Sequence, residues 1–231
     1  MAAWMDGQSY LRLAAQDPHA TLIPVAPAYH DLPLNTRGSR AGHLVNVIIH
    51  KDNKIYISCG YRAILEYFTN LRGYKWAYDR EESFTGHFYT LHKLRQMGEN
   101  ANFFSNIASS GSQRGSIQMV RDKIADAAAV DAACLNYYLE KEPDSARGEL
   151  HILETWGPFS PYPLVANSRL PENVRNKIAE TLLELHTSAE GRQLLSKFGI
   201  KRFLPISPSD FSEEKSIVDP VKDLKFKAVY Y

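Results

Sequence analysis

Short apolar runs alternate with amphipathic stretches along most of the 231 residues. Runs of β-branched or small apolar residues, such as "HLVNVIIHKD" (43–52) and "ADAAAV" (125–130), predict strands. Stretches with apolar residues at helical spacing predict helices; "CGYRAILEYFTNLRG" (59–73) is one, and Gly73 ends it. Because strands alternate with helices of this length, we expect an α/β fold with parallel or mixed sheets.

The remaining elements follow the same two patterns. Strands are predicted over 21–29, 43–52, 74–79, 102–110, 125–130, 150–156 and 164–167, and helices over 59–73, 83–98, 112–123, 131–141, 171–188 and 189–199. The Pro-rich stretch "GPFSPYP" (157–163) predicts a stiff crossover. The polar tail from Ser207 onward predicts an irregular wrap.

The order of these elements predicts two lobes. Residues 46–159 form a self-contained block, so we expect them to make one lobe, and residues 1–45 together with 160–231 to make the other. Two chain segments that pass between two α/β lobes are typical of hinged proteins that close on a ligand in a cleft.

Composition and charge narrow the range of partners. The net charge is +1, which favours neither nucleic acid nor an anionic membrane surface. No apolar run approaches the roughly 20 residues that a membrane-spanning helix needs, so membrane insertion is not expected. The opening "MAAWMDGQSYLRLAAQD" lacks the features of a signal peptide, so a cytoplasmic location is expected for the chain as written.

Reactive groups are sparse in the sequence. Cys59 and Cys134 both lie in apolar helical patterns and are expected to be buried free thiols. The sequence shows no metal-ligand spacing and no Ser/His/Asp or Cys/His arrangement typical of nucleophilic catalysis. We therefore expect no metal, no cofactor and no catalytic residue.

Three strand-to-helix junctions carry the candidate binding residues. The first, "YDREESFTGHFYTL" (78–91), offers Ser83, Thr85 and Gly86, and the second, "SSGSQRGSIQMV" (109–120), offers Ser112 and Gln113. Hydroxyls, free amides and the helix dipole at such a helix start favour an anion. Ligands of open parallel sheets bind at the carboxyl ends of the strands, where the following helices begin. At the third junction, Asp131 is therefore expected to place an acceptor beside these donors.

Each junction also has a simpler interpretation. Ser83 can be an ordinary N-cap, "SGS" is a common turn, and Asp131 can cap its own helix. Tyr29, Trp156 and Tyr162 fall at predicted crossovers or strand ends, where they either line a cleft or serve as partly buried structure. His87 lies near the first junction, where it either faces the cleft or lies at the surface, and a surface position is expected for it.

Taken together, these stretches resemble the phosphate-, phosphite- and phosphonate-binding group of solute-binding proteins, which serve bacterial ABC transporters. The resemblance runs in family order over nearly the whole chain, through "WMDGQSY" (4–10), "LIPVAPAY" (22–29), "LVNVIIHKD" (44–52), "LRGYKWAYDREESFTG" (71–86), "SGSQRGSIQMVRDKIADAAAVDAACL" (110–135), "ILETWGPFSPYPLVA" (152–166) and "LLELHTSAEGRQLLSKFGIKRFLPIS" (182–207). It implies a type II periplasmic-binding-protein fold, with two α/β lobes and a ligand cleft between them. Members are usually periplasmic and usually begin with a strand and a helix ahead of the first matched stretch, so the chain is expected to be shortened at its start.

The resemblance also implies site residues. The anion loop "D-x-x-S-x-[ST]-G" of the family is similar to Asp79 through Gly86, with Ser83 and Thr85 as hydroxyl donors. A second anion contact of the family corresponds to Gln113, which donates a hydrogen bond without carrying a charge. Asp131 matches a cleft position that suits an amino group, whereas the neighbouring acid of aminophosphonate binders is replaced by Ala133.

Three functions remain open on this basis. The first is non-catalytic binding of a small phosphate- or phosphonate-type anion, with specificity from Asp131, Tyr29, Trp156 and Tyr162. The second is an enzyme on the same scaffold, with Asp131 or His87 as its general base. Lyases of menaquinone biosynthesis and the pyrimidine synthases of fungal thiamine biosynthesis also have this scaffold. The third is an interaction module without a ligand, whose exposed edge strands would favour a homodimer.

Overall fold

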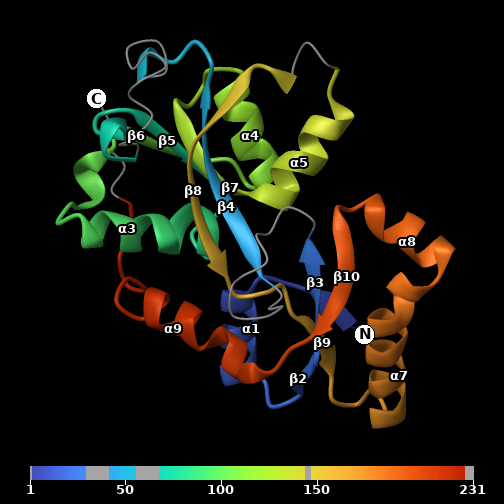
Figure 1. Ribbon diagram of the computed structural model, residues 1–231. Helices are drawn as coiled ribbons and strands as arrows, with labels where there is room; N and C mark the ends of the chain where they lie inside the picture. Colours follow the sequence, from blue (N-terminus) through green and yellow to red (C-terminus); the bar gives the residue numbers. More distant parts are fainter. Residues whose placement is uncertain (1, 30–41, 56–67, 144–146, 227–231) are drawn as a thin grey trace. The chain divides into compact units, whose positions relative to one another are not determined.

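The computed structural model describes residues 2–29, 42–55, 68–143 and 147–226 (Figure 1). The chain divides into two compact units, one made of Met1–Leu44 and Pro158–Ser216 and the other of Val45–Gly157 and Ile217–Tyr231. The lobe limits expected from the sequence, at 45/46 and 159/160, remain a prediction beside this division, which assigns the tail after Ser216 to the second unit.

The first unit combines two small antiparallel sheets with helices. Its three-stranded sheet has the order β1-β9-β2, and a separate pair joins β10 to β3. Its elements are β1 (Ala2–Trp4), α1 (Gly7–Gln16), β2 (Ala20–Ile23), β3 (Val25–Tyr29), β9 (Leu164–Asn167), α7 (Glu172–Glu184), η5 (Leu185–Thr187), α8 (Ala189–Ser196), β10 (Ile200–Pro205) and η6 (Pro208–Phe211).

The second unit is built on one five-stranded sheet with the order β6-β5-β7-β4-β8. Its elements are η2 (Phe68–Leu71), β5 (Lys75–Tyr78), η3 (Phe84–Tyr89), α3 (Thr90–Gln96), η4 (Ala101–Phe103), β6 (Asn106–Ser109), α4 (Gln113–Arg121), β7 (Ala127–Asp131) and α5 (Ala132–Lys141). Strands β4 (His43–His50) and β8 (Leu150–Phe159) and helix α9 (Ser212–Val218) each run across the division between the units.

The core of the second unit explains why α4 and α5 pack onto the sheet. Strand β7 reads "AAAVD" and is buried throughout, so its alanines leave room for helices close above the sheet. Ile117 and Val120 of α4 and Leu135 of α5 pack into one apolar cluster with strand residues such as Ala128. Both helices begin at the same edge of the sheet, because β5 runs parallel to β6 and to β7.

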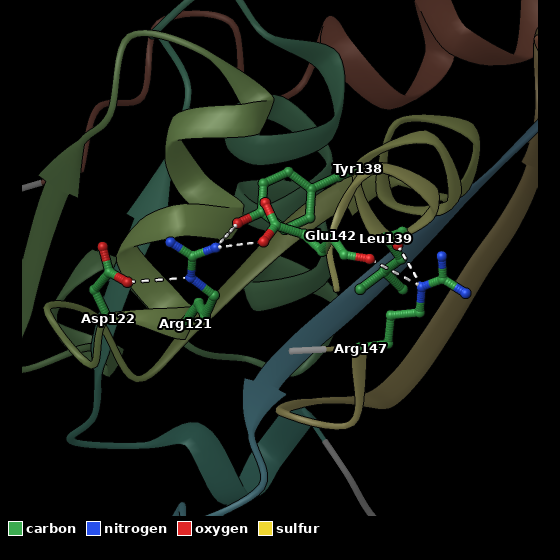
Figure 2. Close-up of polar contacts among 6 residues, drawn as sticks. All are labelled: Arg121, Asp122, Tyr138, Leu139, Glu142 and Arg147. Carbon is green, nitrogen blue, oxygen red and sulfur yellow. Dashed lines mark hydrogen bonds and ion pairs between the residues drawn. The ribbon is translucent and has the colours of Figure 1, made fainter. Parts of the chain in front are cut away.

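A polar cluster joins the far ends of these two helices (Figure 2). Nη1 of Arg121, at the end of α4, donates to the hydroxyl of Tyr138 at 2.6 Å and pairs with a carboxylate oxygen of Glu142 at 3.2 Å. Arg147 donates through Nε to the carbonyl oxygens of Leu139 at 2.9 Å and Glu142 at 3.2 Å. Arg121 thereby links the C-terminal ends of α4 and α5.

Several predicted elements are confirmed within the described residues, and others need correction. The predicted strand 21–29 is two strands separated at Pro24, and the predicted strand 102–110 is only Asn106–Ser109. Strand β8 continues to Phe159, into the stretch 157–163 that was expected to be a crossover. It tolerates Pro158 because it is an edge strand of its sheet, where a missing N–H costs no ladder bond.

The start and the tail also differ from expectation. Strand β1, helix α1 and strand β10 were not expected, and the tail forms η6 and α9 instead of an irregular wrap. A capping box begins this region, in which the Ser207 amide donates to Oδ2 of Asp210 at 2.7 Å. Most of the predicted helix 59–73, including Cys59, lies outside the described residues.

Candidate functional site

The first junction follows β5, where Ser83 caps the next helix. Its hydroxyl oxygen accepts from the Gly86 amide at 3.2 Å and lies 3.3 Å from the Thr85 hydroxyl. The helix begins as a π-helix, in which the Phe88 amide donates to the Ser83 carbonyl five residues earlier, and it continues as α3. Single π-helical turns occur frequently at functional sites, because they change the direction of side chains in an otherwise regular helix.

Gly86 faces the carboxyl group of Asp79. A side-chain Cβ at this position would lie 2.6 Å from Oδ1 of Asp79 and 3.3 Å from its amide nitrogen. The Gly86 carbonyl also accepts from the indole N–H of Trp76 at 3.4 Å. Close packing against Asp79 is therefore a reason for glycine here, in addition to the ligand access that the sequence predicts.

The second junction follows β6 and is joined to the first by hydrogen bonds. The Ser110 amide donates to the Tyr78 carbonyl at 2.8 Å, and the Gly111 amide donates to the Asp79 carbonyl at 2.9 Å. Ser112 caps α4 by accepting from the Gly115 amide at 3.0 Å. These hydrogen bonds join the loops that precede the two helix starts.

The third junction is the N-cap position of α5, which Asp131 occupies without a side-chain capping bond. Its Oδ2 accepts from Nε2 of Gln113 at 2.8 Å, and its amide donates to Oε1 of Gln113 at 2.9 Å. The same Nε2 lies 3.4 Å from the Thr85 hydroxyl. Asp131 is therefore not a simple helix cap, and one network of Thr85, Gln113 and Asp131 joins all three junctions.

Two buried acids shape the electrostatics of this edge. Burial raises the pKa of Asp79, although contacts with Ser83 and with the backbone partly oppose the shift. Burial also raises the pKa of the Cys134 thiol to about 11, and the charges of Asp131 and Asp79 add to that effect. Cys134 is a free cysteine, as expected, and it is half-buried.

His87 is buried rather than at the surface, which corrects the expectation. It is 3% exposed, and burial lowers its pKa, so the neutral ring is favoured. Its ring centroid lies 5.1 Å from that of Phe88, 5.1 Å from that of Phe226 and 5.8 Å from that of Tyr78. The aromatic surroundings, which hydropathy alone does not reveal, explain this burial.

The three predicted cleft aromatics lie in different places. Trp156, in the second unit, is buried against Phe68 and Tyr89, and its indole N–H donates to Glu154 at 2.7 Å. Tyr29 ends β3 of the first unit, and Tyr162 of the same unit packs against His43 with ring centroids 4.8 Å apart. A role in ligand contact remains a prediction for all three.

Metal clusters and membrane-spanning helices are both absent from the described residues. They contain no group of three or more His, Cys, Asp or Glu side chains placed to hold a metal ion. Among the helices of the described segments, none combines the length and the apolar character required to span a membrane.

Comparison with known proteins decides the family. Residues 2–211 match the family described as the periplasmic substrate-binding protein of phosphonate ABC transporters. The chain belongs to this family. The predicted resemblance is thereby confirmed, and the family is a periplasmic one, while the cytoplasmic location expected for the chain as written remains a prediction.

Solved structures of phosphonate-transporter binding proteins share the fold. A binding protein component of an ABC phosphonate transporter from Pseudomonas aeruginosa is 16% identical with a TM-score of 0.74, over 94% of this chain and 67% of that one. PhnD1 from Prochlorococcus marinus, in complex with methylphosphonate, is 18% identical with a TM-score of 0.76, over 96% of this chain and 79% of that one. A Xanthomonas citri protein bound to ATP is 15% identical with a TM-score of 0.65, over 96% of this chain and 78% of that one.

These neighbours confirm the predicted type II periplasmic-binding-protein fold, with α/β architecture and mixed sheets. No protein of curated function matches the sequence.

Proposed function

We propose that the second unit binds a small phosphorus oxyanion, of the phosphonate or phosphate type, without chemical change to it. The observation that carries the proposal is the hydrogen-bonded network of Thr85, Gln113 and Asp131, because it draws three strand-to-helix junctions together. Membership in a phosphonate-binding family supports the ligand class. The methylphosphonate held by the Prochlorococcus marinus protein is a ligand of that class.

The donors for the anion come from the first two junctions. The hydroxyls of Ser83 and Thr85 lie 3.3 Å apart, close enough to contact one oxyanion together. Helix geometry leaves the first-turn amides of α4, at Gln113 and Arg114, without acceptors inside the helix. Backbone donors and the helix dipole then favour a negative charge at this edge, and Gly86 and Ser112 shape the two helix starts.

The acceptors set the kind of anion. Asp131 is fixed by Gln113, and its carboxylate favours a ligand that carries a hydrogen donor, such as a P–OH or amino group, over one without any. The Gln113 side chain is neutral, so charge pairing with the anion plays no part at that position. Tyr29, Trp156 and Tyr162 are proposed as further contacts, and a homodimer stays a prediction.

A thermal-shift screen tests the proposal. The purified chain is heated with phosphate, phosphite, sulfate, methylphosphonate or phosphorylated metabolites. A ligand at 100 times its dissociation constant adds about 2.7 kcal/mol of stability, which raises the Tm of a chain of this size by roughly 5–10 °C. We expect such a shift with a phosphorus compound and a smaller one with sulfate; a folded sample that responds to none of them contradicts the proposal.

A further inference from the structure

Asp79 is a buried acid whose carboxyl group lies against the first helix start of the candidate site. The side chain is 6% exposed, and its Oδ1 has no hydrogen-bond partner among the residues that the structure describes. Oδ1 instead lies against the bare Cα of Gly86, where a Cβ would be only 2.6 Å away. A buried carboxylate oxygen without a donor favours the protonated form, because its negative charge is neither solvated nor paired.

Groups on the neighbouring elements do not neutralise this carboxyl. Burial raises the pKa of Asp79. On the same loop, a hydrogen bond from the Ser83 side chain lowers this pKa most and the charge of Arg80 lowers it least, but burial outweighs both. On β5, the charge of Asp79 contributes to the raised pKa of Tyr78. Gly111 donates to the backbone carbonyl of Asp79.

A second buried acid, Asp131, lies at the third junction. It is 5% exposed, and the charges of Asp131 and Asp79 both raise the pKa of Cys134 on α5. Arg114 opposes them at that thiol, with the smallest effect of the four causes. Oδ2 of Asp131 accepts a side-chain amide hydrogen from Gln113.

We propose that Asp79 takes up a proton when an oxyanion binds beside Ser83 and Thr85, so that binding is coupled to pH through this one carboxyl. The proposal rests on the proposed function, since it concerns the same site. An arriving anion repels an ionised Asp79, whose loop also carries the two hydroxyls that contact the anion. The proton comes from solvent and stays on the carboxyl, and no covalent bond to the ligand forms or breaks.

The consequence is a loss of affinity as pH rises. Below the pKa of Asp79 the carboxyl is already neutral, and the anion binds without further uptake. Above this pKa, Asp79 must take up a proton from solvent each time an anion binds. The affinity for the anion therefore falls by up to about tenfold for each pH unit. Asp79→Asn mimics the neutral acid in shape and lacks the titration, so its affinity is expected to lack this part of the pH dependence.

Calorimetric titration with methylphosphonate tests the coupling. Binding is measured between pH 4.5 and 8.0 in two buffers of different ionisation enthalpy, for the wild-type chain and for Asp79→Asn. The protonation of methylphosphonate itself is the same in both titrations and cancels in their difference. We expect the wild type to take up at least about 0.5 proton per anion more than Asp79→Asn at some pH in this range.

Two further measurements separate the possible outcomes. Asp122→Asn, which changes an exposed acid outside the candidate site, is taken through the same titration and is expected to keep the uptake that depends on Asp79; uptake that vanishes with Asp122→Asn and persists with Asp79→Asn overturns the proposal. Binding with equal uptake in the wild type and Asp79→Asn also overturns it and leaves the proposed function standing. If methylphosphonate, phosphate and phosphite all fail to bind the folded chain, the proposed function fails and the coupling falls with it.

Urea unfolding without ligand examines the buried acid by itself. The unfolded chain ionises Asp79 at its ordinary pKa of about 3.9, whereas the folded chain holds the proton to a higher pH. The contribution of Asp79 to the free energy of unfolding is therefore fully present below about pH 3.9. It is lost as the pH rises through the pKa of Asp79 in the folded chain. We expect the free energy of unfolding of the wild type to fall relative to that of Asp79→Asn over this pH range. If the two free energies change with pH in parallel, Asp79 is not the titrating group.

Discussion

Replacing Ser83 and Thr85 together by alanine is expected to weaken oxyanion binding at least 100-fold while the chain stays folded. Each hydroxyl that donates to a charged oxygen contributes about 1.5–3 kcal/mol, so the loss of two corresponds to about 3 kcal/mol or more. Stability should fall by only about 1 kcal/mol, because Ser83 also caps its helix through the Gly86 amide. Calorimetry with the best ligand of the screen measures the first effect, and urea unfolding measures the second.

A matched variant exists in the first unit. Ser188 caps α8 by accepting from the Gly191 amide at 2.9 Å, so Ser188→Ala removes the same kind of cap. It should cost similar stability and leave affinity unchanged. An unchanged affinity in the double variant, or an equal loss of affinity in both proteins, would show that the anion does not contact the Ser83 and Thr85 hydroxyls.

Gly86→Ala is expected to damage both stability and binding. The new methyl group would meet Oδ1 of Asp79 at 2.6 Å and Cβ of Tyr78 at 3.3 Å, and neither belongs to a flexible surface side chain. Overpacking of this kind costs about 1–3 kcal/mol, and the loop that carries Ser83 must move to relieve it. Urea unfolding should show the loss of stability, and the affinity for the oxyanion should fall with it.

Gly148→Ala provides the comparison for this change. No heavy atom lies within 4 Å of the position that its Cβ would take, and Gly148 is exposed. Its stability should stay within about 1 kcal/mol of the wild type, with full affinity. If Gly86→Ala were as stable as Gly148→Ala and bound equally well, the close packing of Asp79 against Gly86 would not matter for the site.

The parts of the fold that could be predicted are those in which local pattern and burial agree. Strand β4 and helix α4 follow apolar patterns that any α/β core would produce, and both form close to the predicted limits. The order of strands β5, β6 and β7 along the chain also predicts that the three junctions lie in one block of the sequence. Family resemblance then supplied the fold as a whole, which pattern alone does not specify.

The parts that could not be predicted depend on contacts between distant residues. The π-helical start at Phe84 has no separate sequence signal, and the burial of His87 depends on Phe226 from the far end of the chain. The pairing of Gln113 with Asp131 needs β5 to lie between β6 and β7, an order that the sequence does not state. A missed signal was present in the tail, where Ser207 and Asp210 have the spacing of a capping box.

The measurement that tests the central claim most directly is a map of amide chemical shifts during titration with methylphosphonate. We predict that the largest changes fall on the amides of Thr85, Gly86, Gln113 and Arg114, which begin the two helices of the site. The amides at the start of α8, a helix capped by Ser188 in the first unit, should change little. Changes centred on α8, or no changes at Thr85 and Gln113 when the ligand is saturating, would contradict the account.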